Sequence, residues 1–253
     1  MKVLRINDYR RTRELVEPSV VAVGFFDGVH KGHQHVILKA KEIAEQTGEK
    51  WGVMTFDPHP SVVLKGVSNA RYLTPLPVKE KLIEDLGADY LFIVPFTKEL
   101  ASLSPKRFVD EFFAGLRISH VVAGFDFSFG HKGKGSMEII DELADNQFST
   151  TTVKKVEESA EKISSTRIRH LLDAGEISKV NELLGRPYEV RGTHSVDGVI
   201  DIPSYYHLPL EGMYQANAEE ETVTVTIRQN QIFLDESLSK EGEEINIAFL
   251  EKL

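Results

Sequence analysis

The sequence contains no cysteine, which excludes disulfide bonds, a thiolate nucleophile and any metal centre with cysteine ligands. It also lacks an uninterrupted apolar run approaching the roughly 18–20 residues that a membrane-spanning helix requires. The N-terminal stretch MKVLRINDYRRTREL carries too many charged side chains for a signal peptide. We therefore expect a cytoplasmic protein without a membrane partner.

A surplus of basic residues is missing as well. The chain has 30 lysines and arginines against 39 aspartates and glutamates, which gives a net charge of −9. A general nucleic-acid-binding protein normally carries a basic surplus on one face, so we expect no nucleic acid as partner. Any phosphate group that the protein binds must be held by a local pocket. The composition leaves the oligomeric state undetermined.

Over its first 185 residues, the chain alternates regularly between two kinds of segment. Apolar, β-branched runs predict buried strands, and the segments between them repeat apolar residues at helical spacing. Strands are predicted at 19–25, 51–56, 90–96, 120–125 and 151–157, and helices at 33–48, 77–87, 104–116, 136–147, 165–175 and 178–185. This alternation is typical of right-handed βαβ units. We predict a Rossmann-like α/β domain whose parallel sheet is covered by helices on both faces.

After Gly185 the helical spacing disappears. The stretches RPYEVRGTHSVDGVIDIPSYYHLPL and ETVTVTIRQNQIFL hold short strand-like runs separated by turn residues. We predict a small all-β domain here. Residues 1–185 would form the first domain and residues 186–253 the second.

Polar, titratable side chains gather where the first predicted strand gives way to a helix, in GFFDGVHKGHQH. Ligands of parallel α/β sheets bind at the carboxyl ends of the strands, where a loop leads into a helix N-terminus. Gly24 and Gly28 let the backbone approach a ligand closely, and the first amides of the helix favour a phosphate. His30 and His33 are three residues apart, so they can face one oxyanion from the same side of the helix. The structural alternative is a turn whose histidines only cap the helix, but this spacing directly after a strand favours a phosphate site.

This stretch resembles the H-x-G-H signature of nucleotidyltransferases. Three further stretches, MTFDPHP, VAGFDFSFG and ISSTRIR, follow in the order and spacing of the bacterial FAD synthetase module. GRPYEVRG, at residues 185–192, resembles the junction that leads into the kinase half of bifunctional riboflavin kinase/FAD synthetases. H-x-G-H alone would fit any member of the superfamily, whereas the motifs together are specific.

The resemblance implies transfer of the adenylyl group of ATP to the phosphate of FMN, with FAD and pyrophosphate as products. It implies catalytic roles for His30, His33, Ser165, Thr166 and Arg169, and ATP binding by Gly24, Phe25, Phe26, Asp27, Gly32, Ser164 and Arg167. The hydroxyl groups and guanidinium forks of ISSTRIR would form a second phosphate cradle facing the first. Alone, that motif would fit a capped surface helix with solvated arginines.

Magnesium is expected as a companion of ATP, although no carboxylate cluster identifies a protein ligand for it. Asp27 is a candidate either for ordering the His30 loop or for contacting metal-bound water.

The resemblance assigns flavin binding to a second set of residues, which comprises Phe56, Pro58, His59, Pro60, Asp126, Phe127 and Phe129. The prolines stiffen the loop, and the phenylalanines are suited to stacking on an isoalloxazine ring. Without the resemblance, clustered phenylalanines would fit a hydrophobic core equally well. Ser128 stands where family members often carry a basic residue, which removes one anchor for the acceptor phosphate.

The second domain departs further from the family. Riboflavin kinases resemble one another by a G-x-P-T-A-N stretch whose Thr and Asn bind Mg-ATP, whereas here Pro203 is followed by Ser204 and Tyr205. The chain also ends at Leu253, short of a full kinase half. We expect a reduced riboflavin-kinase-like barrel that lacks kinase activity.

Three functions therefore remain open, of which the first is a monofunctional FAD synthetase. The others are a flavin-nucleotide-binding regulator without turnover, and an adenylyltransferase with another acceptor, such as a pantetheine, nicotinamide or glycerol phosphate. The complete set of both histidines and the Ser-Ser-Thr-x-Ile-Arg stretch favours an enzyme. FDPHP and FDFSFG favour a flavin as acceptor.

Overall fold

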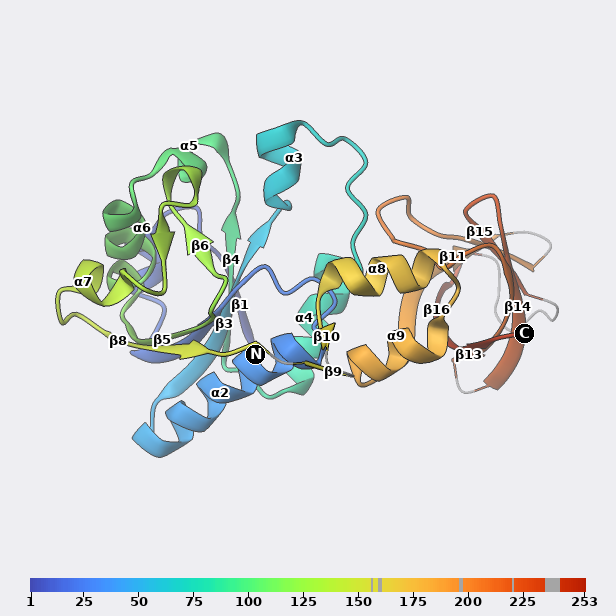
Figure 1. Ribbon diagram of the computed structural model, residues 1–253, viewed down its shortest axis with the longest axis horizontal. Helices are drawn as coiled ribbons and strands as arrows, with labels where there is room; N and C mark the ends of the chain where they lie inside the picture. The colour runs from blue at the N-terminus through green and yellow to red at the C-terminus, as the bar shows by residue number, and fades with distance from the viewer. Residues whose placement is uncertain (156, 159–160, 196–197, 220, 235–241) are drawn as a thin grey trace. The chain divides into compact units, whose positions relative to one another are not determined.

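The computed structural model describes residues 1–155, 157–158, 161–195, 198–219, 221–234 and 242–253 (Figure 1). Its contacts divide the chain into two compact units. The first unit comprises Met1–Ala70 and Leu76–Val156, and the second comprises Arg71–Pro75 and Glu157–Leu253.

The first unit is built on a six-stranded sheet in which all neighbouring strands are parallel. The strand order is β1-β4-β3-β2-β5-β8. In chain order these are β1 (Lys2–Arg5), β2 (Ser19–Val23), β3 (Lys50–Asp57), β4 (Tyr90–Pro95), β5 (Ile118–Gly124) and β8 (Ser149–Val153). From β2 the chain runs outward through β3 and β4 on one side, and β5 then pairs with the other side of β2. The switch point of the sheet therefore lies between β2 and β5, where α/β proteins bind their ligands.

Strand β2 is buried on both faces because helices cover both sides of the sheet (Figure 1). Val20 and Ala22 pack into one core with apolar residues of α2 (Lys31–Thr47) and α4 (Leu76–Asp85). Val21 and Val23 point to the opposite core, which includes residues of α6 (Pro105–Phe112) and α7 (Ile140–Ala144). The shorter elements of this unit include α1 (Tyr9–Arg13), α3 (Pro60–Lys65), α5 (Lys98–Ser102), β6 (Ser128–Phe129) and β7 (Gly135–Ser136). The predicted Rossmann-like layers are confirmed.

The structure differs from the predicted elements at three places. Strand β1 was not predicted, because it pairs only with β4 at the sheet edge and buries only Leu4 of its four residues. Helix α2 begins at Lys31 rather than at His33, so both site histidines belong to the start of the helix. The last predicted strand is shorter than expected, and residue 156 of it lies outside the described residues.

The second unit contains a closed antiparallel barrel in the strand order β11-β12-β15-β14-β13-β16. These strands are β11 (Tyr188–His194), β12 (Val199–Asp201), β13 (Gly212–Ala218), β14 (Glu221–Arg228), β15 (Gln231–Leu234) and β16 (Glu244–Lys252). This unit also contains β9 (Glu157–Glu158), β10 (Glu161–Lys162), α8 (Ser165–Asp173) and α9 (Ile177–Leu184). The predicted all-β architecture is therefore confirmed for the barrel. The domain boundary predicted after Gly185 falls between α9 and β11. It stays a prediction.

Candidate active site

The loop between β2 and α2 has an unusual backbone. Phe26 and Val29 have φ values of 54° and 40°, and Gly28 between them has a φ of 95°. A left-handed conformation is rare for a β-branched residue such as Val29, and it costs energy. The Phe26 and Val29 side chains are 4% and 1% exposed, so packing in the core holds the strained turn in place. Strain that is maintained by packing is a recurrent feature of ligand-binding loops.

The two histidines of this loop stack on each other. Their ring centroids are 3.5 Å apart with an interplanar angle of 18°. His30 is the N-cap of α2, and its Nδ1 accepts a hydrogen bond of 3.1 Å from the backbone N–H of His33. The predicted placement of both rings on one side is confirmed. The capping role of the structural alternative is confirmed for His30 alone. The backbone N–H of His33 already donates to His30. The imidazole pair, and not this amide, is therefore suited to bind a phosphate.

Two other predicted motifs lie at the same edge of the sheet as this loop. Strand β2 pairs with β3 and β5, and the carboxyl ends of all three lie together because the strands are parallel. FDPHP spans the end of β3 and the start of α3. His59 is the N-cap of α3, and its Nδ1 accepts a hydrogen bond of 3.1 Å from the backbone N–H of Ser61. FDFSFG follows β5 on the other side of the switch point. The parallel sheet thus brings three sequence motifs to one edge.

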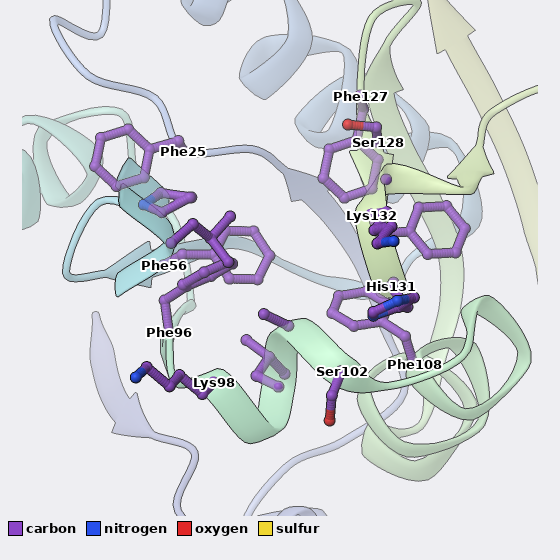
Figure 2. A pocket seen from close by; sticks show the side chains of 17 residues that line it. Phe25, Phe56, Phe96, Lys98, Ser102, Phe108, Phe127, Ser128, His131 and Lys132 are labelled. Atoms are coloured by element: carbon purple, nitrogen blue, oxygen red, sulfur yellow. The ribbon is translucent and has the colours of Figure 1, made fainter. Parts of the chain in front are cut away.

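An apolar cavity of about 570 Å³ lies beside these motifs, within the size range of roughly 300–1,000 Å³ that small-molecule sites occupy. Figure 2 shows Phe25, Phe56 and Phe96 on one side of the cavity, and Phe127, Ser128 and Lys132 on the other. The lining residues are Phe25, Phe56, Pro60, Leu64, Phe96, Lys98, Leu100, Ala101, Ser102, Phe108, Phe127, Ser128, Phe129, Gly130, His131, Lys132 and Gly133. All of them belong to the first unit.

Four of the residues predicted to bind flavin line this cavity, namely Phe56, Pro60, Phe127 and Phe129. The others, Pro58, His59 and Asp126, are not among the lining residues. Phe25 was predicted to bind ATP, yet its ring forms part of the cavity wall and meets the His59 ring edge-on at 4.4 Å between centroids. Phe25 therefore belongs to the histidine loop by its backbone and to the cavity by its side chain.

Sequence reasoning missed the residues that follow β4 and the β6 strand. Phe96, Lys98 and Leu100 come directly after β4, and their only signal was their place at the carboxyl end of a predicted strand. His131 and Lys132 follow FDFSFG and are exposed beside the otherwise apolar wall. The buried Lys79 on α4 was also missed, because a lysine in an amphipathic helix is normally expected at the surface.

The ISSTRIR motif starts α8, as predicted. Ser164 is the N-cap, and its Oγ accepts a hydrogen bond of 3.2 Å from the backbone N–H of Arg167. Ser165 and Thr166 occupy the first turn, and Arg169 donates from Nη2 to the carbonyl oxygen of Arg71 at 3.4 Å. This motif belongs to the second unit, so its placement opposite His30 and His33 remains a prediction.

The described residues include no group of three or more His, Asp or Glu side chains that could hold a metal ion. Magnesium stays a prediction, as the companion of ATP. Within the same described segments, no helix has the length and apolar character that crossing a bilayer requires.

A parallel, helix-covered sheet with a strained histidine loop at its switch point defines an α/β protein whose H-x-G-H stretch lies where such sheets bind their ligands. The comparison with known families agrees and is more specific. The chain belongs to the FAD synthetase family, whose model matches residues 12–167, more than half of the chain.

Individual relatives extend this comparison. The chain is 49% identical over 176 residues to a bifunctional riboflavin kinase/FMN adenylyltransferase of Listeria monocytogenes, covering 69% of this chain and 56% of that protein. It is 45% identical over 194 residues to the protein of the same name in Bacillus subtilis, covering 76% of this chain and 61% of that protein. The chain thus spans less than two thirds of the length of these two curated relatives. An FAD synthetase of L. monocytogenes is 32% identical over 208 residues, covering 81% of this chain and 84% of that protein.

Among solved structures, a protein of Streptococcus pneumoniae described as a macrolide-efflux protein has the same fold. Its TM-score is 0.88 at 24% identity, and the match covers 100% of this chain and 91% of that one. This similarity supports the fold alone.

Proposed function

We infer that this chain is an FMN adenylyltransferase, which transfers the adenylyl group of MgATP to FMN and yields FAD and pyrophosphate. The observation that carries this proposal is the position of Phe25. Its backbone belongs to the loop that leads to the stacked histidines, and its ring is part of the wall of the apolar cavity. A phosphate-binding loop and an acceptor pocket that share one residue are suited to joining two substrates.

In the proposed reaction, a phosphate oxygen of FMN attacks the α-phosphorus of ATP. The new P–O bond forms as the bond to the bridging oxygen of the β-phosphate breaks, and pyrophosphate leaves with that electron pair. Catalysis of such transfers consists mainly of positioning and of neutralising the charge that develops on the phosphates. We assign this task at the α-phosphate to His30 and His33. Ser165, Thr166 and Arg169 would hold the β- and γ-phosphates.

The flavin ring is assigned to the aromatic cavity. Phe56 is 8% exposed and its ring centroid lies 6.3 Å from those of Phe96 and Phe108, so the cavity has a firm aromatic wall. Phe127 stacks on Phe129 at 5.6 Å between centroids on the other side. Planar aromatic ligands gain from offset or edge-on contact with such rings. A pantetheine or glycerol phosphate has no planar ring system to make these contacts.

The acceptor phosphate needs a cationic partner, and Ser128 supplies none. Lys98, His131 and Lys132 line the same cavity and are exposed to solvent, which suits them to the phosphate end of the acceptor. We propose that these side chains take the role that a basic residue at position 128 often has in the family.

The proposal is for FAD synthesis without riboflavin kinase activity. It is supported by the sequence of the second unit, in which Pro203 is followed by Ser204, Tyr205 and Tyr206 where the family's kinases carry Thr, Ala and Asn. Two of the relatives above are named as bifunctional enzymes, so the kinase assay is part of the test. A cytoplasmic location is kept as a prediction from the cysteine-free sequence.

The experiment that tests the function is incubation of purified protein with FMN and MgATP, followed by chromatography of the flavins and measurement of pyrophosphate. FAD and pyrophosphate should form in equal amounts. Binding of FMN without any FAD would support the regulator. Faster turnover with the phosphate of pantetheine, nicotinamide riboside or glycerol would support the other acceptors.

A further inference from the structure

Lys79, on helix α4, is a buried lysine of the first unit. It is 3% exposed, and lysine is almost never fully buried unless it is paired. Its Nζ donates to the carbonyl oxygen of Phe25 at 2.7 Å and to Oγ1 of Thr55 at 3.2 Å. The Thr55 hydroxyl in turn donates to the same Phe25 oxygen at 2.9 Å. The three groups form a closed triangle between α4, the histidine loop and β3.

The Lys79 ammonium also contacts the Phe25 ring. Nζ lies 4.3 Å from the ring centroid, within the range of a cation–π interaction. One side chain therefore holds Phe25 at two points, the carbonyl oxygen and the aromatic face. The Phe25 ring is part of the cavity wall. The next residue, Phe26, has a φ of 54° and begins the strained turn. Lys79 therefore contacts the residue that connects the cavity wall to the turn.

Two carboxylates act on this ammonium. Asp27, in the histidine loop, and Asp57, at the end of β3, both raise the pKa of Lys79, but burial outweighs them and lowers that pKa from 10.5 to about 8. A buried charge that the fold disfavours is expected where function uses it rather than where packing needs it.

We propose that Lys79 is a positioning residue for adenylyl transfer. It holds Phe25 in place and thereby fixes the position of the histidine loop relative to the acceptor cavity. This inference rests on the proposed function. Lys79 itself does not touch the reacting atoms in this assignment. Its effect passes through the Phe25 carbonyl to the loop that carries His30 and His33, and through the Phe25 ring to the site of the flavin.

The first test compares Lys79→Met with Lys81→Met, an exposed lysine of the same helix that pairs with Asp85 at 2.7 Å. Lys79→Met should lower kcat and raise the KM for FMN, each by about tenfold or more, because a hydrogen bond to a charged group is lost. Lys81→Met should change neither. A merely structural role would reduce the amount of active enzyme and leave the KM for FMN unchanged.

A second variant tests whether the ammonium itself is responsible. Because the chain contains no cysteine, Lys79→Cys introduces a single thiol, which can be alkylated with 2-bromoethylamine in denaturant before refolding. The alkylated side chain has an ammonium at nearly the length of lysine. It should recover most of the lost kcat and the low KM for FMN, compared with wild-type protein treated in the same way. Failure of this rescue in correctly refolded protein would overturn the role of the charge.

Amide hydrogen exchange provides a readout that does not need turnover. In Lys79→Met, peptides covering residues 24–34 should exchange faster than in wild type, while those of α6 and α7 should exchange no faster. Unchanged exchange at 24–34, or kinetic constants within twofold of wild type, would refute the positioning role. If wild-type protein makes no FAD, the proposed function fails, and the exchange experiment still decides whether Lys79 orders the loop.

Discussion

Replacing Lys79 by methionine should stabilise the first unit at neutral pH even though it impairs the site. Methionine has a similar length and no charge, so it can fill the same space without burying an ammonium. Burial lowers the pKa of Lys79 from 10.5 to about 8, and this difference corresponds to roughly 3 kcal/mol of destabilisation by the charged form. The hydrogen bonds of Lys79 offset about 1 kcal/mol of that amount. The Phe25 carbonyl keeps the Thr55 hydroxyl as a donor in the variant. A net gain of roughly 2 kcal/mol at pH 7 is expected.

The gain should depend on pH in a defined direction. Below about pH 8, Lys79 carries its proton in both the folded and the unfolded state, so the cost of burying the charge is fully present. Between about pH 8 and 10.5, the folded protein releases this proton while the unfolded chain keeps it, and the cost falls as the pH rises. Above about 10.5 both states are neutral and the cost is gone. The free-energy difference between Lys79→Met and wild type should therefore be largest at pH 7 and should vanish or reverse above pH 10.5.

Urea unfolding at several pH values measures this difference. Trp51 is the single tryptophan of the chain, and it lies buried in β3, so its fluorescence reports on the first unit. Lys81→Met is the control, because an exposed ion pair contributes less than about 1 kcal/mol. A Lys79→Met variant that is less stable than wild type at pH 7, or a difference that is constant from pH 7 to 10, would refute the reasoning.

Three further predictions concern the reaction. His30→Asn keeps a side-chain acceptor for the helix N-terminus but removes the imidazole, so we expect kcat to fall roughly a hundredfold with little change in stability. The control is His35→Asn, at an exposed position of the same helix, whose kcat should be close to that of wild type. A wild-type kcat in His30→Asn would show that the catalytic groups lie elsewhere. Phe127→Ala should raise the KM for FMN about three- to tenfold by loss of a ring contact. Phe125→Ala, outside the cavity lining, should leave this KM unchanged. Equal effects of the two substitutions would contradict the assigned flavin site. Riboflavin with MgATP should give neither FMN nor FAD over a long incubation, and accumulation at a rate comparable to FMN adenylylation would show an active kinase.

Features that depend on residues close together in the chain were predictable from the sequence. The apolar run of β2 and the helical spacing after it identified the βα junction, because burial on both faces leaves a local pattern. The stacking of His30 and His33 follows from helix geometry, which places residues three apart on one side. The Ser164 cap of α8 likewise depends on a hydrogen bond to the third residue after it.

Features that depend on which distant segments meet were decided by the tertiary structure alone. The apolar cavity takes its wall from residues after β2, β3, β4 and β5, which lie together only because the strands are parallel and ordered around a switch point. Phe25 was assigned to ATP from its place in a motif, and only the packing of β3 and α4 against the loop showed its ring in the cavity wall. From the sequence, Lys79 would be interpreted as an ordinary surface lysine of its helix. Periodicity predicts which face of a helix is buried, but it does not predict which polar groups of other segments will contact that face. Its partners are 54 and 24 residues away in the chain, and a charge becomes buried or exposed according to such long-range contacts.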